Sequence, residues 1–180
     1  APDELLVAAP LLTHQEAEGL MERVAGRQIP ALGAQLQTAV LRPLFALLVA
    51  QRIAAVEGAT GIHEVIDRVV DDVVSRENYD LFAELRALAV ETIRGGGAID
   101  PATIAAADVA ARIRSSPLVT TTGRKCAFAL ATFEQWFAAH AILDGIVGMD
   151  EVLSTMDTFD RWRYVLAILA ATGDPARAST

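Results

Sequence analysis

Apolar residues recur every three or four positions along most of this chain of 180 residues. Residues 62–74 show the spacing most clearly, because isoleucines and valines take one side of the repeat and acidic residues the other. A repeat of about 3.6 residues predicts an amphipathic helix, since a half-buried strand repeats every second residue. Alanine, the strongest helix former, occupies 34 positions, against 12 glycines and 7 prolines. The chain is therefore expected to be mostly helical.

Local signals predict where several of these helices begin and end. Thr13 and Glu16 have the spacing of a capping box, and Gly26 predicts the end of the helix that the box starts. Pro43 can open the next apolar helix, residues 44–56, because the first helical position needs no N–H donor. That helix is apolar on nearly all sides, so we expect it to be buried. Other helices are expected over residues 31–41, 62–74, 81–93, 149–156 and 158–171, and from about residue 131.

One segment has the composition of a β-hairpin. Residues 117–121 and 125–129 are strand-like and flank a Thr-Gly-Arg turn. The helix over residues 81–93 and a helix expected over residues 100–115, which an Asp-Pro pair starts, precede this hairpin. Together with the helix from residue 131, this order outlines a winged helix. The predicted fold is mostly α: a helical bundle, then a winged helix with one hairpin as its wing, then the start of a further helical domain.

Composition and charge narrow the range of functions. Acidic residues outnumber basic ones by 23 to 15, a net charge of −8. Nucleic acid and anionic membranes are therefore poor partners, because phosphate contacts need clustered Lys and Arg. No apolar run reaches the ~18 residues of a membrane span, and no targeting segment is visible. We expect a cytoplasmic protein, and the missing initial Met suggests a piece of something longer.

No motif for nucleotide hydrolysis is present. A phosphate-binding P-loop needs Gly-x-x-x-x-Gly-Lys-Ser/Thr, which the chain lacks. Residues 123–125 are Gly-Arg-Lys but lie in the predicted hairpin turn. The glycines at 95–97 follow a helix rather than the strand that a dinucleotide site requires. We therefore expect the chain itself to be no enzyme and to hold no cofactor of its own.

Metal ligands and nucleophiles are scattered along the chain. The acidic residues of the helix over 62–74 do not all face one another, so they predict a solvated face. The three histidines lie on different predicted helices, the single cysteine is expected to be a buried inert thiol, and the serines at 115–116 have no histidine nearby. No metal or catalytic site is predicted. The residues concerned are Glu64, Asp67, Asp71, Asp72, His14, His63, His140 and Cys126.

A winged helix also suggests a DNA-binding protein. The recognition helix would be residues 100–115 and the wing residues 120–125. Base reading uses the first turns of that helix, where this chain has Asp100 and Asp108, while its arginines come only at the far end. A winged-helix transcriptional regulator is therefore the weaker alternative. A helical adaptor that buries apolar faces against a partner protein is another.

Residues 128–139 read Phe-Ala-Leu-Ala-Thr-Phe-Glu-Gln-Trp-Phe-Ala-Ala. This run resembles the Phe-x-His-x-Ser/Thr-Phe-Gln-Glu-aromatic-Phe-Ala-Ala signature that closes the winged helix of NACHT-type STAND NTPases, a family of signal-transducing proteins. Residues 42–48, Arg-Pro-Leu-Phe-Ala-Leu-Leu, are similar to the proline-leucine helix of the family's first helical domain. Residues 11–17, 60–74 and 161–166 also resemble family segments in the same order, so the resemblance covers nearly the whole chain.

The resemblance implies the regulatory middle of a longer protein that binds ATP or ADP. It divides the chain into the end of the nucleotide-binding core or a linker (residues 1–12), a first helical domain (13–78), a winged helix (79–140) and the start of a second helical domain (141–180). Such a region would couple nucleotide state to a conformational change. Its partners would be the protein's own nucleotide-binding core and C-terminal sensor region, and other proteins.

Two positions correspond to the family's nucleotide contacts. The proline of the first helical domain packs on the adenine, a role that the resemblance assigns to Pro43. A winged-helix histidine contacts the terminal phosphate in the resting state, but this chain has Leu130 there, which donates no hydrogen bond. The Gln-Glu pair is also reversed, at residues 134–135. We expect Leu130 to be buried on the strand face that it shares with Cys126 and Phe128. The aromatic residues that follow are expected to form core: Phe133, Trp136 and Phe137.

Overall fold

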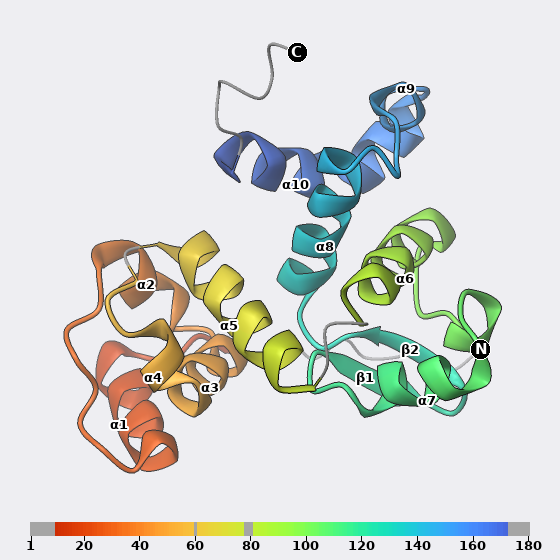
Figure 1. Ribbon diagram of the computed structural model, residues 1–180. Coiled ribbons are helices and arrows are strands. Elements are labelled where there is room, and N and C mark those ends of the chain that lie inside the picture. The colour runs from red at the N-terminus through yellow and green to blue at the C-terminus, as the bar shows by residue number, and fades with distance from the viewer. Residues whose placement is uncertain (1–9, 60, 78–80, 173–180) are drawn as a thin grey trace. The chain divides into compact units, whose positions relative to one another are not determined.

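The computed structural model describes residues 10–59, 61–77 and 81–172, and 66% of these residues are α-helical. They form ten α-helices and a small antiparallel hairpin (Figure 1), which confirms the predicted mostly α fold. The chain divides into two compact units, Ala1–Asp72 and Val73–Thr180. Most of the predicted linker, residues 1–12, lies outside the described residues.

The first unit is built from helices whose predicted boundary signals are present. Its helices are α1 (His14–Ala25), α2 (Ala34–Ala39), α3 (Pro43–Gln51), α4 (Ile53–Val56) and the start of α5 (Ile62–Glu77). Thr13 Oγ1 accepts the Glu16 N–H at 3.3 Å, and the Glu16 carboxylate accepts the Thr13 N–H at 2.8 Å. Gly26 ends α1 at φ 65°, and Pro43 is the first residue of α3. The capping box, the C-terminal stop and the proline start are thereby confirmed.

Two helices of this unit differ from prediction. The helix expected over residues 31–41 is shorter, because Gly33 is still extended and α2 starts only after it. The helix expected over residues 44–56 is divided at Arg52, whose φ of −119° lies outside the helical range, into α3 and α4. Leu44 is exposed rather than buried, because α3 packs on α1 with only one face. The buried residues of α3 are Phe45, Ala46, Val49 and Ala50.

The second unit contains the winged helix. Its elements are α6 (Leu81–Gly95), the 3₁₀ turn η1 (Pro101–Thr103), α7 (Ala107–Ser115), β1 (Val119–Thr122), β2 (Lys125–Phe128), α8 (Ala131–Leu143), α9 (Met149–Val152) and α10 (Met156–Thr172). The hairpin pairs Val119 with Phe128 and turns at Gly123, where φ is 61°. Ile99 forms an isolated antiparallel bridge with Cys126, so the chain adds a third, short partner to the hairpin. The predicted hairpin is confirmed.

The prediction of one helix over residues 100–115 is wrong for the first half of that range. The chain makes only the 3₁₀ turn η1, becomes extended at Ala106 and begins α7 afterwards. Pro101 and Ile113 are both buried. In one continuous helix they would point about 120° apart, because twelve residues do not complete a whole number of turns of 3.6 residues. The break lets both side chains face the core.

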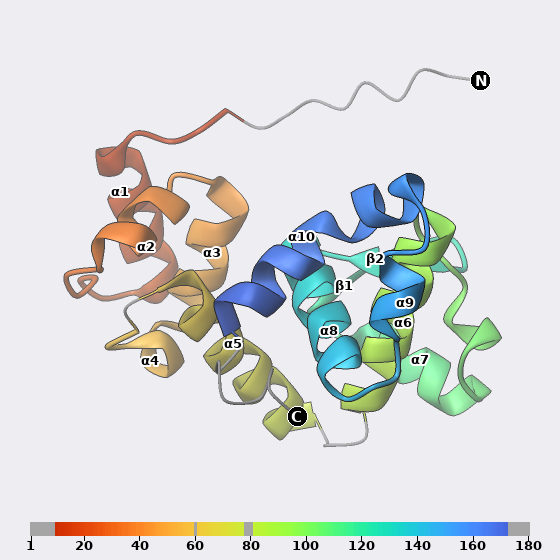
Figure 2. The same ribbon diagram turned by 90° about the horizontal axis from the view of Figure 1, so that it is seen from above.

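Helix α8 forms the centre of the second unit. It packs against α6, α10 and β2 (Figure 2), so residues on nearly every side of it are buried. The ring of Phe137 lies 5.5 Å from Phe82 of α6, 5.5 Å from Phe128 of β2 and 5.0 Å from Trp136. Trp162 of α10 is 1% exposed. The expectation that Phe133, Trp136 and Phe137 form core is confirmed.

Candidate functional site

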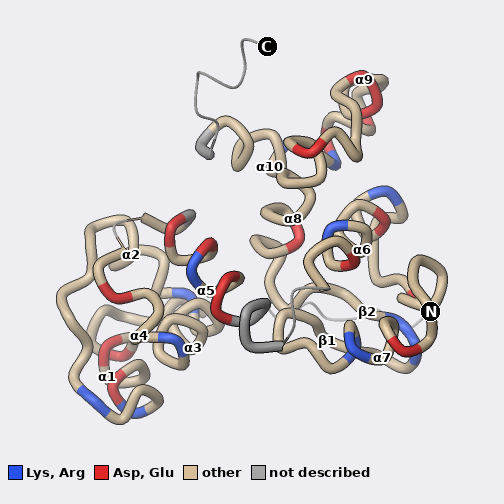
Figure 3. Tube along the Cα trace, viewed as in Figure 1, with Lys and Arg blue, Asp and Glu red and all other residues tan. Residues whose placement is uncertain are grey.

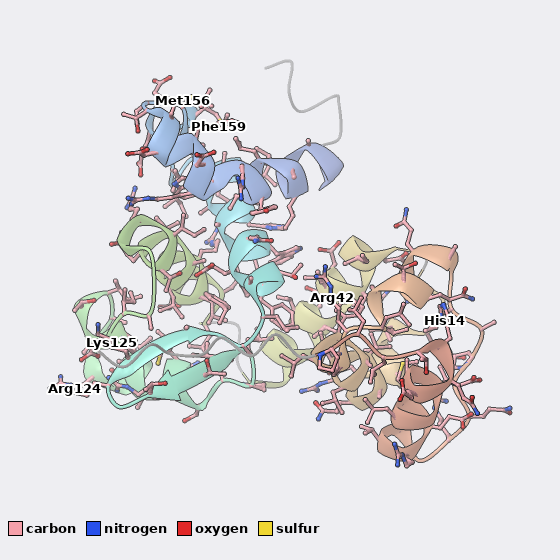
Figure 4. All side chains as sticks on the ribbon, turned by 180° about the vertical axis from the view of Figure 1, so that it is seen from behind. His14, Arg42, Arg124, Lys125, Met156 and Phe159 are labelled. Carbon is pink, nitrogen blue, oxygen red and sulfur yellow. The ribbon has the colours of Figure 1, made fainter. Side chains whose placement is uncertain are left out.

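Pro43 lies at the exposed start of α3. Its ring is half-buried, and the residue before it, Arg42, is exposed. Arg42 is the N-cap of α3, and its carbonyl accepts the Ala46 N–H at 3.0 Å. Figure 4 shows the Arg42 side chain beside this helix start. An apolar ring next to a guanidinium is suited to a flat base that carries a phosphate. The sequence predicted no separate role for Arg42, which is only the first residue of the segment that resembles the proline-leucine helix.

Leu130 is half-buried, so the prediction that it is buried was wrong. Strand β2 ends at Phe128, and the hydrogen bond from Ala129 N to Leu118 O, 2.8 Å long, is the last between the two chain segments there. Leu130 is instead the N-cap of α8 and supplies no side-chain cap. Cys126 and Phe128 do share the buried strand face. Leu130 lies in the second unit and Pro43 in the first.

Asp100 joins three segments of the winged helix. Its Oδ1 accepts the Ala102 N–H at 3.0 Å and Arg114 NH2 of α7 at 2.8 Å. Its Oδ2 accepts Arg124 Nε, in the hairpin turn, at 3.0 Å. The Ala102 N–H and then the two guanidinium charges hold the pKa of this carboxyl below its ordinary value of 3.8, despite partial desolvation. Asp100 therefore connects η1, α7 and the wing.

The face of the winged helix that would read DNA is poor in cations. The exposed positions in the first turns of α7 are alanines and Asp108. Arg114 and Arg124 are both engaged by Asp100. Lys125 is exposed and lies beside Arg124 on the wing (Figure 4). This surface can pack against a protein more readily than against a phosphate backbone.

A half-open cleft of about 360 Å³ lies between α1 and α2 in the first unit. Its lining combines apolar side chains, among them Met21, Ile29 and Leu32, with a larger polar surface to which His14 and Glu18 belong. The size is that of a small-molecule site. The cleft was not predicted from the sequence. It forms where the loop between α1 and α2 folds back, and no local residue pattern marks that arrangement.

The other candidate residues have structural roles or remain apart. Arg52 pairs with Asp72 at 2.6 Å and Arg68 with Glu64 at 2.5 Å, so part of the expected solvated acidic face is ion-paired. Cys126 is buried, as predicted. Among the described residues no three His, Cys, Asp or Glu side chains gather as a metal site would require. Within the same residues no helix has both the length and the apolar character needed to cross a membrane.

Comparisons of this chain with protein-family models, with curated proteins and with solved structures found no match.

Replacing Asp100 by asparagine should make the free energy of unfolding depend less on pH in the acidic range. The folded-state pKa of Asp100 is lowered, so its contribution to stability is present above the unfolded value near 3.8 and is lost as pH falls through the folded value. Urea unfolding at pH 6 and pH 3 should show a smaller pH-dependent loss for Asp100→Asn than for the wild type. Asp71→Asn, at an exposed position of the first unit, is the control. Equal pH dependence of the wild type and Asp100→Asn would contradict this role.

Substitutions at Leu130 should show how much of its contribution to stability comes from side-chain burial and how much a capping side chain could add at this position. Leu118→Ala, at a site 2% exposed, should cost on the order of 2–5 kcal/mol, and Leu130→Ala should cost clearly less. Leu130→Ser should be about 1 kcal/mol more stable than Leu130→Ala, because serine caps the N-terminus of α8 and alanine does not. Thermal and urea unfolding measure both differences. If Leu130→Ala cost as much as Leu118→Ala, Leu130 would be a core residue.

Proposed function

We propose that this chain is the regulatory helical and winged-helix region of a cytoplasmic NACHT-type signalling NTPase. The observation that carries the proposal is the structural use of residues 128–139. This run, which resembles the family's closing signature, leads from the end of the wing into α8, and its aromatic residues are buried against α6, β2 and α10. The burial of these aromatic residues supports the proposal that the run closes the winged helix, as the family signature does.

The order of the units also supports the proposal. A helical unit that contains the proline-leucine helix precedes a winged helix, which is the order that the resemblance implies. Pro43 stands at an exposed helix start with one part of its ring accessible. We infer that in the longer protein this ring packs against the adenine of a nucleotide held by the preceding core, with Arg42 beside it.

The nucleotide itself would be held elsewhere in the longer protein. Binding and hydrolysis require a loop of backbone N–H groups, a lysine on the phosphates and acidic residues on the metal, and the sequence has no such loop. This region would act by shifting against the core between the ADP-bound and ATP-bound states. Purified alone, it should turn over no ATP.

Leu130 sets this chain apart from the family pattern. It is half-exposed, so it can contact a neighbouring domain, but it has neither a charge nor a hydrogen-bond donor for a phosphate. We infer that nucleotide retention in this protein depends on the helix start at Pro43 and not on the winged helix.

A nucleotide-release experiment tests this assignment. In the longer protein loaded with fluorescent ADP, Pro43→Ala should speed ADP release about tenfold, the effect of losing one good contact. Pro30→Ala, a matched change at another half-buried proline of the same unit, and Leu130→Ala should leave the rate unchanged. Release that is fast from the Leu130 variant and unchanged in the Pro43 variant would contradict the assignment.

The upstream coding sequence and a DNA-binding assay distinguish the alternatives. A P-loop motif about 150–250 residues before Ala1, the size of one α/β domain, is expected. Its absence would contradict the proposal. Salt-dependent binding of the isolated chain to duplex DNA would favour the transcriptional regulator instead.

A further inference from the structure

Exposed apolar side chains concentrate in one short segment. Six of the ten large apolar side chains that are exposed among the described residues lie within residues 143–159, and their exposed fractions run from 38% to 73%. We call these six residues the α9 surface: Leu143, Ile146, Met149, Leu153, Met156 and Phe159. Figure 4 shows the last two at the start of α10. Single exposed apolar residues are ordinary, whereas a concentration of them marks an interaction site.

The α9 surface belongs to an ordered part of the second unit. Val147 and Val152, which alternate with its exposed residues, are 1% and 0% exposed. The Glu151 carboxylate of α9 accepts two hydrogen bonds from the Arg94 guanidinium of α6, both 2.7 Å long. Arg161 donates to the Arg94 carbonyl at 2.9 Å and so ties α10 to the same place. The apolar side chains are therefore held outward by a fixed backbone.

Acidic residues outnumber basic ones in the segment that carries the α9 surface. Residues 143–160 contain five Asp or Glu and no Lys or Arg, and Arg161 and Arg163 follow in α10. Figure 3 shows the red segments of α9 and α10 with a blue segment beside them. Three of the five are balanced by arginines of α6 and α10: Asp144 by Arg86, Glu151 by Arg94 and Asp160 by Arg163. Asp150 and Asp157 are exposed and make no ion pair within the described part of the chain. An apolar strip with a surplus of negative charge at its margin is complementary to an apolar strip with a positive margin.

We propose that the α9 surface is a docking site for a basic amphipathic helix of a partner protein. Its members lie at the end of α8, in the turn that follows, in and directly after α9, and in the first turn of α10, and α9 and α10 contact each other. An amphipathic helix can lay its apolar face on such a surface. Met149 and Met156 can adapt their shape to such a face. Lysines and arginines at the edges of the bound helix would lie against Asp150 and Asp157. This inference does not rest on the proposed function.

The charge of the α9 surface also disfavours binding of a second copy of the chain or of an anionic membrane. A second copy would bring the same carboxylates against one another, which costs affinity. An anionic membrane attracts basic helices and repels an acidic margin. A basic helix satisfies both the apolar strip and its margin.

A synthetic peptide tests the site directly. The probe is a fluorescein-labelled helix of about four turns, with leucine on one face and lysine on the other, titrated with the full chain at ~0.15 M salt. Met156→Lys or Leu153→Lys should weaken binding about tenfold or more, as loss of a central anchor does. Leu44→Lys is the matched control, because it adds the same charge at an equally exposed leucine of the first unit. It should leave binding nearly unchanged.

A second pair of changes leaves the apolar strip intact. Asp150→Asn with Asp157→Asn should weaken binding of the leucine-lysine peptide and not that of a peptide with glutamine in place of lysine. Equal weakening by Leu44→Lys and Met156→Lys would show general attraction to an acidic protein and would overturn the proposal. So would no binding, or a dimer in sedimentation that Met156→Lys converts to monomer, which would assign the surface to a second copy.

Discussion

The burial of α8 on nearly every side is the constraint on which the second unit depends. Its aromatic residues contact α6 and β2, and its other face lies under α10. The wing, the helix that precedes it and the helix that ends the described chain are therefore all positioned by one element. All seven buried residues of α8 are apolar, so this helix forms the hydrophobic centre around which the other elements of the unit pack.

The surface interactions then decide what the winged helix can bind. Asp100 engages Arg114 and Arg124, which are two of the cations nearest to the wing. This carboxylate stabilises the arrangement of η1, α7 and the hairpin, and its single negative charge offsets part of the positive charge of the two arginines. At the other end of the unit, the apolar α9 surface has an acidic margin. Both ends support the proposal that this unit binds proteins and not nucleic acid.

Local signals in the sequence predicted the parts of this fold that local chemistry determines. The capping box at Thr13, the start of α3 at Pro43, the hairpin turn at Gly123 and the aromatic face of α8 all follow from short patterns. The break before α7 did not, because alanines favour a helix throughout and only the burial of Pro101 together with Ile113 explains it. The prediction that Leu130 is buried on the strand face was also wrong, because β2 ends two residues earlier than the alternation of its side chains suggests.

The candidate sites were less predictable from the sequence, because they depend on tertiary packing. The cleft between α1 and α2 and the α9 surface arise from tertiary packing, and a sequence marks neither the loop that folds back nor the side of α9 that stays uncovered. Pro43 was identified as a candidate only through a family resemblance. Arg42 became a candidate only because the structure places it next to Pro43 at one exposed helix start.

Hydrogen exchange of the longer protein, loaded with ADP or with a non-hydrolysable ATP analogue, tests most directly whether nucleotide state reaches this region. We expect slower amide exchange in the first turn of α3 in the ADP state than in the ATP state. In the ADP state Pro43 would pack against the adenine and suppress local opening, whereas in the ATP state the region would have shifted against the core and lost that contact. Identical exchange of α3 in the two states would contradict it.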